Sequence, residues 1–293
     1  VGRANSLQLI AGGARDLLGR PLAFLRLLPE TLSVPAVMTR ARGRAGRGES
    51  MPAPFTAPRT SFNHSLTPHR AVATASLDLD AVKSVTRRLG GTVNDVLLAV
   101  IGGAVRSYLE ANGDVPASSL VAVVPVSTRE DLVTTGANQV SAMFASLATD
   151  VDDPIERYHR ISSAAVTAKR QAASLRPALL DDWGRMSPGR LLAVGMRAYE
   201  SLRLADLHPV VYNLIISNVP GPRTPLYFLG ARITHIHPFG PLLHGAGLSV
   251  TGVSIDGRID LGVISCEHLV PDPDVVARGI ESAFAELVEL SGH

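Results

Sequence analysis

The chain has 293 residues, of which 46% are hydrophobic and 18% charged, and its formal net charge is +2. This composition is too apolar for a disordered protein and too often interrupted by charge for a bundle of membrane-spanning helices, so it predicts a globular protein. The length allows one large domain or two modest ones.

Three features of the sequence bear on the cellular compartment. Cys266 is the only cysteine, so the chain cannot form an internal disulfide, which fits a reducing compartment. Arg3, Arg15 and Asp16 interrupt the N-terminal apolar stretch that a signal peptide would need. Residues 96–105, an uncharged run, are about half of the roughly 20 apolar residues that span a membrane. We therefore expect a cytoplasmic protein.

Residues 1–58 are predicted to precede the compact part of the chain. Residues 7–39 have the apolar spacing of short amphipathic helices, interrupted by prolines, and residues 40–58 have the Arg, Gly and Pro content of a connector. A basic cluster in this connector could contact anionic lipid headgroups at a membrane or lipid droplet. It has no interleaved aromatic residues, which argues against nucleic acid as a partner. The cluster consists of Arg40, Arg42, Arg44 and Arg47.

Residues 59–293 are predicted to form an α/β domain in which helices and strands alternate. Apolar periodicity predicts helices over residues 79–89, 92–109, 154–175, 188–204 and 272–290. Runs of β-branched and small apolar residues predict strands over residues 119–125, 139–147 and 210–219. Asp256 and Gly257 have the composition of a two-residue turn in a later hairpin. This order favours a mixed sheet layered with helices over a simple doubly wound sheet.

An asparagine and an aspartate stand at the head of the apolar helix 92–109. Thr92 and Asp95 have the spacing of a capping box, so a structural role explains Asp95. Asn94 has no such explanation, because it is a poor helix former on a helix that is apolar nearly all round, and we expect it to be buried.

The stretch NVPGP follows the strand predicted over residues 210–219. Pro220 and Gly221 suit the central positions of a type II turn, which would hold the end of the strand rigidly. An ordinary turn is one interpretation. The other is that Ser217 and Asn218 are presented as preorganised polar contacts for a substrate.

Common catalytic motifs are absent from the sequence, which contains no GxSxG elbow, Walker loop, GxGxxG fingerprint or HExxH. His235 and His237 alternate on a stretch that we expect to be a strand, so both side chains should point to one face, and His244 follows. Nothing in the sequence specifies a third ligand, and we therefore predict ordinary polar histidines and no metal site.

Several stretches together resemble one family. They are the ND pair in TVNDVLLA (92–99), SNVPGP (217–222) and HPFGPLLHGAGLSVT (237–251). FNHSLTPHRAVATASLDLDAVKSV, VVPVSTRED and VPDPDVVARGIESAFAEL extend the likeness from about Arg59 to the end of the chain. The stretches are similar to those of the bacterial wax ester synthase and diacylglycerol acyltransferase family, which includes the triacylglycerol synthases of mycobacteria.

The resemblance implies a fold and a reaction. Family members look like chloramphenicol acetyltransferase and peptide-synthetase condensation domains, with two α/β lobes facing each other across a tunnel. Acyl-CoA and the hydroxyl group of diacylglycerol or a fatty alcohol meet in the tunnel, where a histidine of an HHxxxDG motif on the first lobe acts as general base. Acyl-CoA is then a substrate, and no cofactor is expected.

This chain departs from the family because it contains no HHxxxDG, and His64 and His69 lie in a segment that follows the first lobe in the family. The resemblance therefore covers the second lobe, and we predict an N-terminal catalytic lobe as its partner. The chain could be part of a split enzyme, an inactive truncated product, or a non-catalytic lipid-surface or assembly module. A condensation lobe that acts on carrier-bound acyl groups is a further alternative. Smaller departures are His237, where the family usually has tyrosine, and Ser249, where it often has asparagine.

The resemblance also suggests roles for individual residues. Asn94 would help organise the lobe interface near the tunnel, together with Asp95, and Ser217 and Asn218 would line the tunnel. Further substrate-binding candidates are Ser127, Arg129, Gly221, Gly245 and Gly247. Ser127 and Arg129 position substrate or simply end a strand, and the two later glycines permit close approach of substrate or of another strand.

Overall fold

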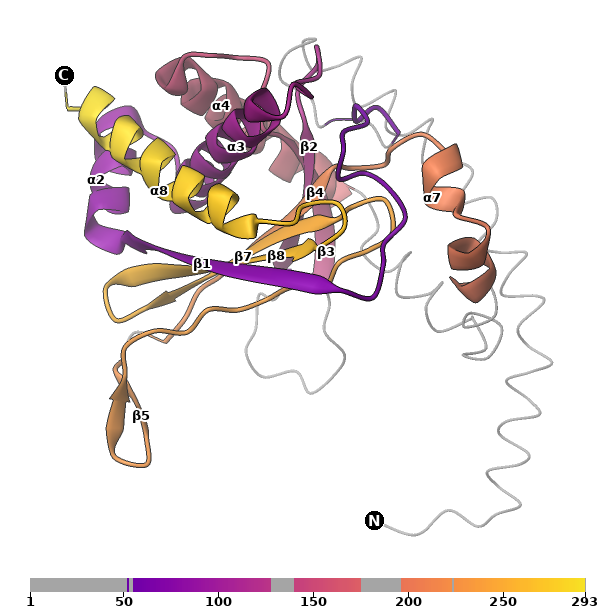
Figure 1. The fold of residues 1–293 in the computed structure, drawn as a ribbon. Helices are drawn as coiled ribbons and strands as arrows, with labels where there is room; N and C mark the ends of the chain where they lie inside the picture. The colour runs from indigo at the N-terminus through magenta and orange to yellow at the C-terminus, as the bar shows by residue number, and fades with distance from the viewer. Residues whose placement is uncertain (1–51, 53–54, 128–139, 175–195, 223, 293) are drawn as a thin grey trace, which may run out of the picture.

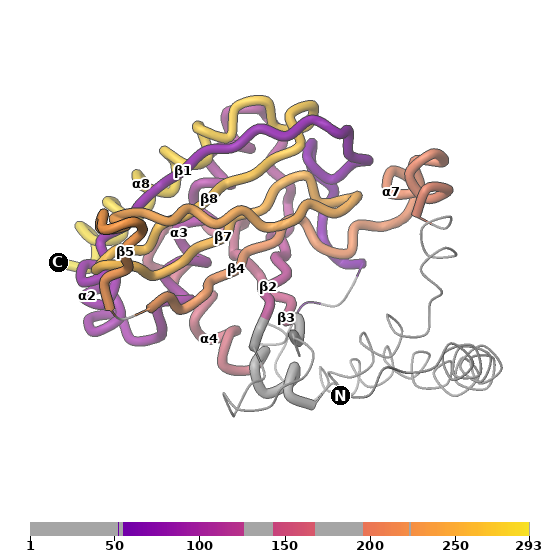
Figure 2. Tube along the Cα trace, turned by 90° about the horizontal axis from the view of Figure 1, so that it is seen from below, coloured from indigo at the N-terminus to yellow at the C-terminus, as the bar shows by residue number. Residues whose placement is uncertain are grey.

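A computed structural model describes residues 52, 55–127, 140–174, 196–222 and 224–292. Its centre is a six-stranded mixed sheet with the order β1-β8-β7-β4-β2-β3 (Figure 2). Strands β2, β4 and β7 run parallel to one another, and the remaining neighbours are antiparallel. The strands are β1 (Arg70–Asp78), β2 (Val121–Ser127), β3 (Val140–Ser146), β4 (Leu214–Val219), β7 (Leu248–Ile255) and β8 (Arg258–Cys266).

Four helices cover one face of this sheet (Figure 1). They are α2 (Leu79–Leu89), α3 (Val93–Ala111), α4 (Pro154–Ser174) and α8 (Pro273–Leu290). The short helix α7 (Leu204–Leu207) lies beyond one end of the sheet, and a small separate hairpin consists of β5 (Leu226–Phe228) and β6 (Ala231–Ile233). Within the described ranges no helix lies over the opposite face, which we call the open face.

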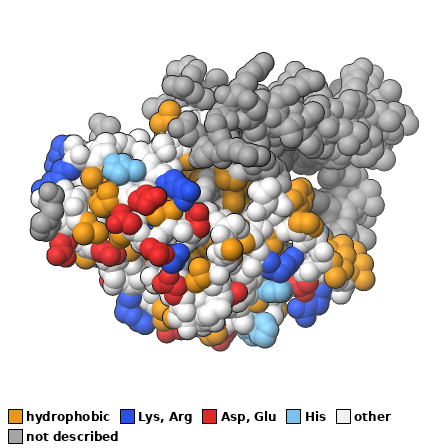
Figure 3. Space-filling model, turned by 90° about the horizontal axis from the view of Figure 1, so that it is seen from above, with side chains coloured by type: hydrophobic (Ala, Val, Ile, Leu, Met, Phe, Trp, Pro, Cys, Tyr) orange, Lys and Arg blue, Asp and Glu red, His pale blue; other side chains and the backbone are white. Residues whose placement is uncertain are grey.

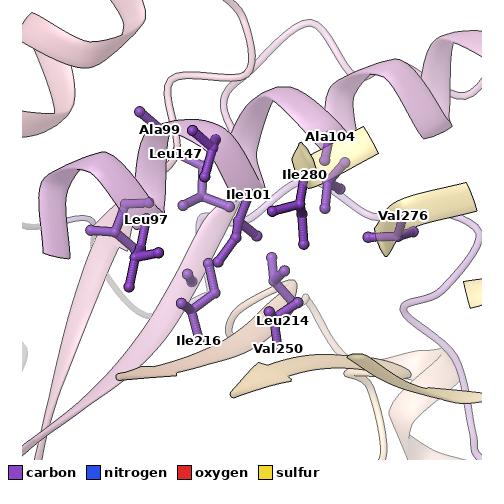
Figure 4. Packing of buried hydrophobic residues seen from close by; sticks show 14 of the residues in the cluster. Leu97, Ala99, Ile101, Ala104, Leu147, Leu214, Ile216, Val250, Val276 and Ile280 are labelled. Atoms are coloured by element: carbon purple, nitrogen blue, oxygen red, sulfur yellow. The ribbon is translucent and has the colours of Figure 1, made fainter. Parts of the chain in front are cut away.

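The core lies between the sheet and α3. Residues 95–105 of α3 are all buried, because this helix packs against the sheet, α8 and α4 at once. Figure 4 shows Leu97 and Ile101 above Ile216 and Leu214 of β4, with Val250 of β7 nearby. Each such side chain contributes roughly 1.5–3 kcal/mol by leaving water. A central position explains why the helix is apolar nearly all round.

The outer surface of the helical layer is ordinary solvated surface. Figure 3, which looks onto this side, shows acidic and basic side chains interspersed with scattered apolar ones over the described part of the molecule. No single described helix is long and apolar enough to cross a membrane, and α2 and α3 meet the length and composition criteria only as a pair bent by 100°.

Most predicted elements are confirmed. Four of the five predicted helices match α2, α3, α4 and α8 closely, and the predicted hairpin turn is present, with positive φ at Asp256 and Gly257. The strand predicted over residues 210–219 begins only at Leu214, and β1 was not predicted. The helix predicted over 188–204 is confirmed over residues 196–201, and its first part lies outside the described residues, as do the N-terminal helices and the basic cluster.

Two buried asparagines connect distant parts of the chain. Asn63 and Asn213 are both fully buried, and Asn213 Nδ2 donates to Asn63 Oδ1 at 2.7 Å and to the Pro58 carbonyl at 2.6 Å. Asn213 Oδ1 accepts from the Val121 amide at 2.8 Å. Asn63 Nδ2 in turn donates to the carbonyls of Asn213 and Gly245. The two amides therefore join the entries of β2, β4 and β7 to the segment before β1.

The Asn213→Ala substitution should lower the free energy of unfolding by about 3 kcal/mol or more, because it leaves several buried donors and acceptors unpaired. Asn112→Ala is the matched control, since the side chain of this exposed asparagine forms one hydrogen bond with the described residues, to the Tyr108 carbonyl. We expect the control to cost within about 1 kcal/mol. Urea unfolding measures both, and equal losses would contradict the structural role of Asn213.

Candidate functional site

The carboxyl ends of the three parallel strands meet at one edge of the sheet. Ser217 pairs with Thr251 and Asn218 with Gly252 in the β4–β7 register, and Ser127 ends β2 at the same edge. In parallel sheets such an edge is a usual place for ligands. The fold therefore brings together three of the predicted site residues, Ser127, Ser217 and Asn218.

Three hydroxyl groups lie side by side on the open face. Ile216 and Val250 point into the core, so their neighbours Ser217, Ser249 and Thr251 point the other way. Ser249 and Thr251 are buried, yet neither hydroxyl oxygen has a hydrogen-bond partner. Leaving such groups unpaired costs about 1–3 kcal/mol each, so orphaned hydroxyls of this kind are candidates for binding a ligand.

The segment 234–247 crosses the open face above these hydroxyls (Figure 2). A Cβ atom on Gly240 would lie 2.7 Å from Thr251 Oγ1 and 3.0 Å from Ser249 Oγ. The segment therefore needs a residue without a side chain at this position. Thr251 was not a predicted site residue, although the alternating hydroxyls of Ser249 and Thr251 on one strand were a readable signal.

The type II turn predicted at Pro220 and Gly221 is wrong. Such a turn requires positive φ at Gly221, which this residue does not have. The glycine is needed for another reason, because a Cβ atom there would lie 1.8 Å from the Ser254 carbonyl oxygen. The backbone of NVPGP thus packs closely on the end of β7. Asn218, directly before it, has a buried Oδ1 without a partner.

The ND pair begins α3 near the same edge. Leu97 lies above Ile216 in Figure 4, which places the start of α3 over the end of β4. The capping box is confirmed: Thr92 Oγ1 accepts from the Asp95 amide, and Asp95 Oδ2 accepts from the Thr92 amide at 2.8 Å. The prediction that Asn94 is buried is wrong, since Asn94 is only half-buried, and its amide forms no hydrogen bond with the described residues.

Asp95 is the buried member of the pair. Only 3% of Asp95 is exposed, and its second oxygen, Oδ1, has no partner. Burial, and then the negative charge of Asp95, raise the pKa of Tyr158 to about 12. Tyr158 therefore stays neutral and donates its hydroxyl hydrogen to the Gly90 carbonyl. Asp95 combines a capping role with a buried oxygen that has no partner among the described residues.

The predicted glycines Gly245 and Gly247 lie at the opposite edge, before β7. The amide of Gly247 donates to the Phe62 carbonyl and that of Gly245 to the His64 carbonyl. Gly247 permits close approach of another chain segment, because a Cβ atom there would lie 2.9 Å from the Phe62 carbonyl oxygen, whereas Gly245 has a positive φ of 87°. Gly245 also lines a cavity of about 640 Å³, the size of a small-molecule pocket, whose other walls include Leu66, Tyr212 and Leu242. Arg129 lies outside the described residues, as does the side chain of Ser127.

His64 and His69, which the sequence analysis named when it found no HHxxxDG motif, do not lie at the strand-end site. His64 Nδ1 lies 3.2 Å from Asp206 Oδ1, at the edge occupied by Gly245. Burial would raise the pKa of Asp206, but hydrogen bonds from the Ser65 amide, Arg203 and His64 outweigh it and lower the pKa to about 2. His69 is exposed at the start of β1. The open face therefore offers polar contacts, with neither of these histidines beside them.

Comparison with family models gives two matches. The C-terminal domain model of the wax ester synthase/diacylglycerol acyltransferase family matches residues 136–288, which is more than half of the chain. The chain belongs to this family. The catalytic-domain model of the family matches residues 3–97. β1 falls in one match and β8 in the other, yet the two strands pair along their whole length. The residues matched by the two models therefore belong to one sheet. The domain boundary predicted after residue 58 stays a prediction.

Curated relatives and solved structures agree with this family. A Mycobacterium tuberculosis protein provisionally named a diacylglycerol O-acyltransferase is 40% identical over 99% of this chain and 57% of its own length. A second one from this species is 35% identical over 92% of this chain and 58% of its own length. The wax ester synthase/diacylglycerol acyltransferase of Marinobacter aquaeolei matches with a TM-score of 0.64 and 27% identity, over 94% of this chain and 58% of that chain.

The predicted fold, an α/β lobe of the CoA-dependent acyltransferase type, is confirmed by these structures. A nonribosomal peptide synthetase shares the fold, with a TM-score of 0.52 at 14% identity, over 89% of this chain and 26% of that chain. The chain spans rather more than half the length of the family relatives above.

Substituting the two members of the ND pair should separate their roles. Asp95→Ala should lower the free energy of unfolding by about 1 kcal/mol, because it removes the capping acceptor and a negative charge at the helix start. Asn94→Ala should change it by less than about 0.5 kcal/mol, because alanine is the better helix former and no hydrogen bond is lost. Chemical unfolding of both variants tests this, and a larger loss for Asn94→Ala would contradict it.

Proposed function

We propose that this chain is the C-terminal lobe of an acyl-CoA-dependent O-acyltransferase whose acceptor is diacylglycerol or a fatty alcohol. The observation that carries the proposal is the strand end of β4, where the buried Oδ1 of Asn218 has no partner. One face of the sheet has a helical layer, whereas no described helix covers the other. A second lobe placed against this side would enclose the strand end around a substrate.

The reaction would divide between the lobes. A histidine of the HHxxxDG motif on the N-terminal lobe would accept the proton of the acceptor hydroxyl, whose oxygen attacks the thioester carbonyl carbon. The carbon–oxygen bond forms, the carbon–sulfur bond breaks, and the CoA sulfur leaves with the proton. This chain would supply the wall of the tunnel. Asn218, whose buried Oδ1 has no partner, would hydrogen bond with the reacting groups from a strand end that packs closely on Ser254 through Gly221.

The test uses the complete two-lobe protein, with release of CoA from palmitoyl-CoA measured in the presence of diacylglycerol or hexadecanol. We expect acyl transfer only when the lobe with HHxxxDG is present. Asn218→Ala should lower kcat by roughly tenfold or more, as loss of a preorganised polar contact does, without a change in Tm. Asn112→Ala, at the far end of α3, is the control. If Asn218→Ala retained full activity, or if the complete protein transferred no acyl group, the proposal would fail.

A second candidate function, a non-catalytic lipid-surface module, is favoured by the β5–β6 hairpin. Its tip exposes Tyr227, Phe228 and Leu229 by 64%, 69% and 92% of their surfaces. Exposed apolar clusters of this kind often contact a partner or a membrane.

Vesicle flotation distinguishes the candidates. If the chain is mainly a lipid-surface module, it should float with phosphatidylcholine vesicles that contain diacylglycerol, and Phe228→Ser with Leu229→Ser should abolish flotation, since two large apolar side chains are lost. Val72→Ser, at an exposed position on β1, is the control. Flotation unaffected by the hairpin substitutions, or absent from the unchanged chain, would argue against this candidate.

A further inference from the structure

His235 and His237 lie stacked above a buried carboxylate on the open face. They belong to an extended segment after β6, not to a paired strand as the sequence predicted, yet both side chains do share one side. Their rings are nearly parallel, at 6°, with centroids 5.7 Å apart. Asp260 of β8 lies beside them, with Oδ1 3.1 Å from His235 Nδ1. One coordinating atom from each of the three residues lies within 4.8 Å of the others.

Asp260 is held in place by groups around it. It is fully buried, its Oδ1 accepts from Ser76 Oγ at 2.7 Å, and its Oδ2 accepts from the Ile236 amide at 2.8 Å. Metal-binding carboxylates in proteins are oriented by outer hydrogen bonds of this kind. A buried carboxylate is stabilised by a positive charge nearby. Among the described residues, the half-exposed His235 is the one possible cation within ion-pair distance of Asp260.

The distances suit a small divalent ion. Ligands bound to zinc at about 2.0–2.2 Å lie roughly 3 Å from one another, close to the separation of His235 Nδ1 and Asp260 Oδ1. His237 Nδ1 is 3.2 Å from the Leu261 carbonyl oxygen, a contact of the kind that orients a metal-binding imidazole. The His235 side chain is 43% exposed, which leaves an entry path and room for water as a further ligand.

We propose that His235, His237 and Asp260 form a binding site for a divalent transition-metal ion, with Zn²⁺ as the best match. Two imidazoles and one carboxylate form a common zinc ligand set that leaves a fourth position open. The ion would fasten the segment that contains Gly240 to β8, and this segment covers Ser249 and Thr251. The site does not depend on the proposed acyl transfer, because none of the three residues has a role in that reaction.

Isothermal titration of the metal-stripped full chain with Zn²⁺ tests the site. We expect one equivalent to bind to this cluster. His235→Gln and His237→Gln should each weaken binding at least about tenfold, and Ser76→Ala, which removes an outer hydrogen bond to Asp260, about tenfold. Co²⁺ gives a second readout, since its visible absorption bands with the unchanged chain should disappear with His237→Gln. Circular dichroism checks that each variant is folded.

The matched controls are His69→Gln and His268→Gln, two exposed histidines on other parts of the surface, and both should bind Zn²⁺ as the unchanged chain does. The proposal is overturned if the unchanged chain binds no Zn²⁺, or if a folded chain with both His235→Gln and His237→Gln binds it equally well. It is also overturned if a control weakens binding as much as His235→Gln. In each case the cluster is an ordinary histidine–aspartate ion pair.

Discussion

The buried amide pair of Asn63 and Asn213 is the constraint on which the rest of the sheet depends. The parallel pairing of β2 with β4 extends over only two residue pairs, from Ala122 and Leu214 to Val123 and Ile215. The hydrogen bonds of Asn213 with Val121 lengthen this contact at its beginning. Without them, β2 and β3 would be joined to the other four strands by a short ladder and by the helices alone. The strand ends that form the candidate site would then lose their common register.

The second constraint is that the sheet is covered on one face only. α3 and its neighbours bury the apolar side chains of β4 and β7, and alternation along each strand then sends Ser217, Ser249 and Thr251 to the open face. Two of these hydroxyls are buried without partners, a cost that a folded protein usually avoids. The segment that contains Gly240 lies directly over both of them. The cluster of His235, His237 and Asp260 lies on the same face. The polar groups of this face therefore come from β4, β7 and β8.

Periodicity predicted the elements whose burial is regular. α8 was readable because its apolar residues repeat at helical spacing over several turns, and α3 because a capping box precedes a long apolar run. β1 was missed because its inward side chains are mainly small, Ala73 and Ala75, whereas Val72 points outward. The strand predicted over 210–219 was too long because Asn213 contacts Val121 through its backbone amide and its side-chain Oδ1, and the backbone ladder begins only after it. The turn predicted in NVPGP was wrong because its glycine is required by the close approach of Ser254, which is 33 positions away in the sequence, and not by a local turn.

The sequence by itself determined what depends on neighbours along the chain: the helices, the capping box of Thr92 and Asp95, the hairpin turn at Asp256, and the motif order typical of the family. Only the tertiary structure decided what depends on residues far apart. It left Asn94 half-buried and Asp95 with a free buried oxygen, and it placed Asp260 beside His235. The physical reason is that capping and turn formation are local interactions. Burial, orphaned hydrogen-bonding groups and ligand sets arise only when separate segments pack together.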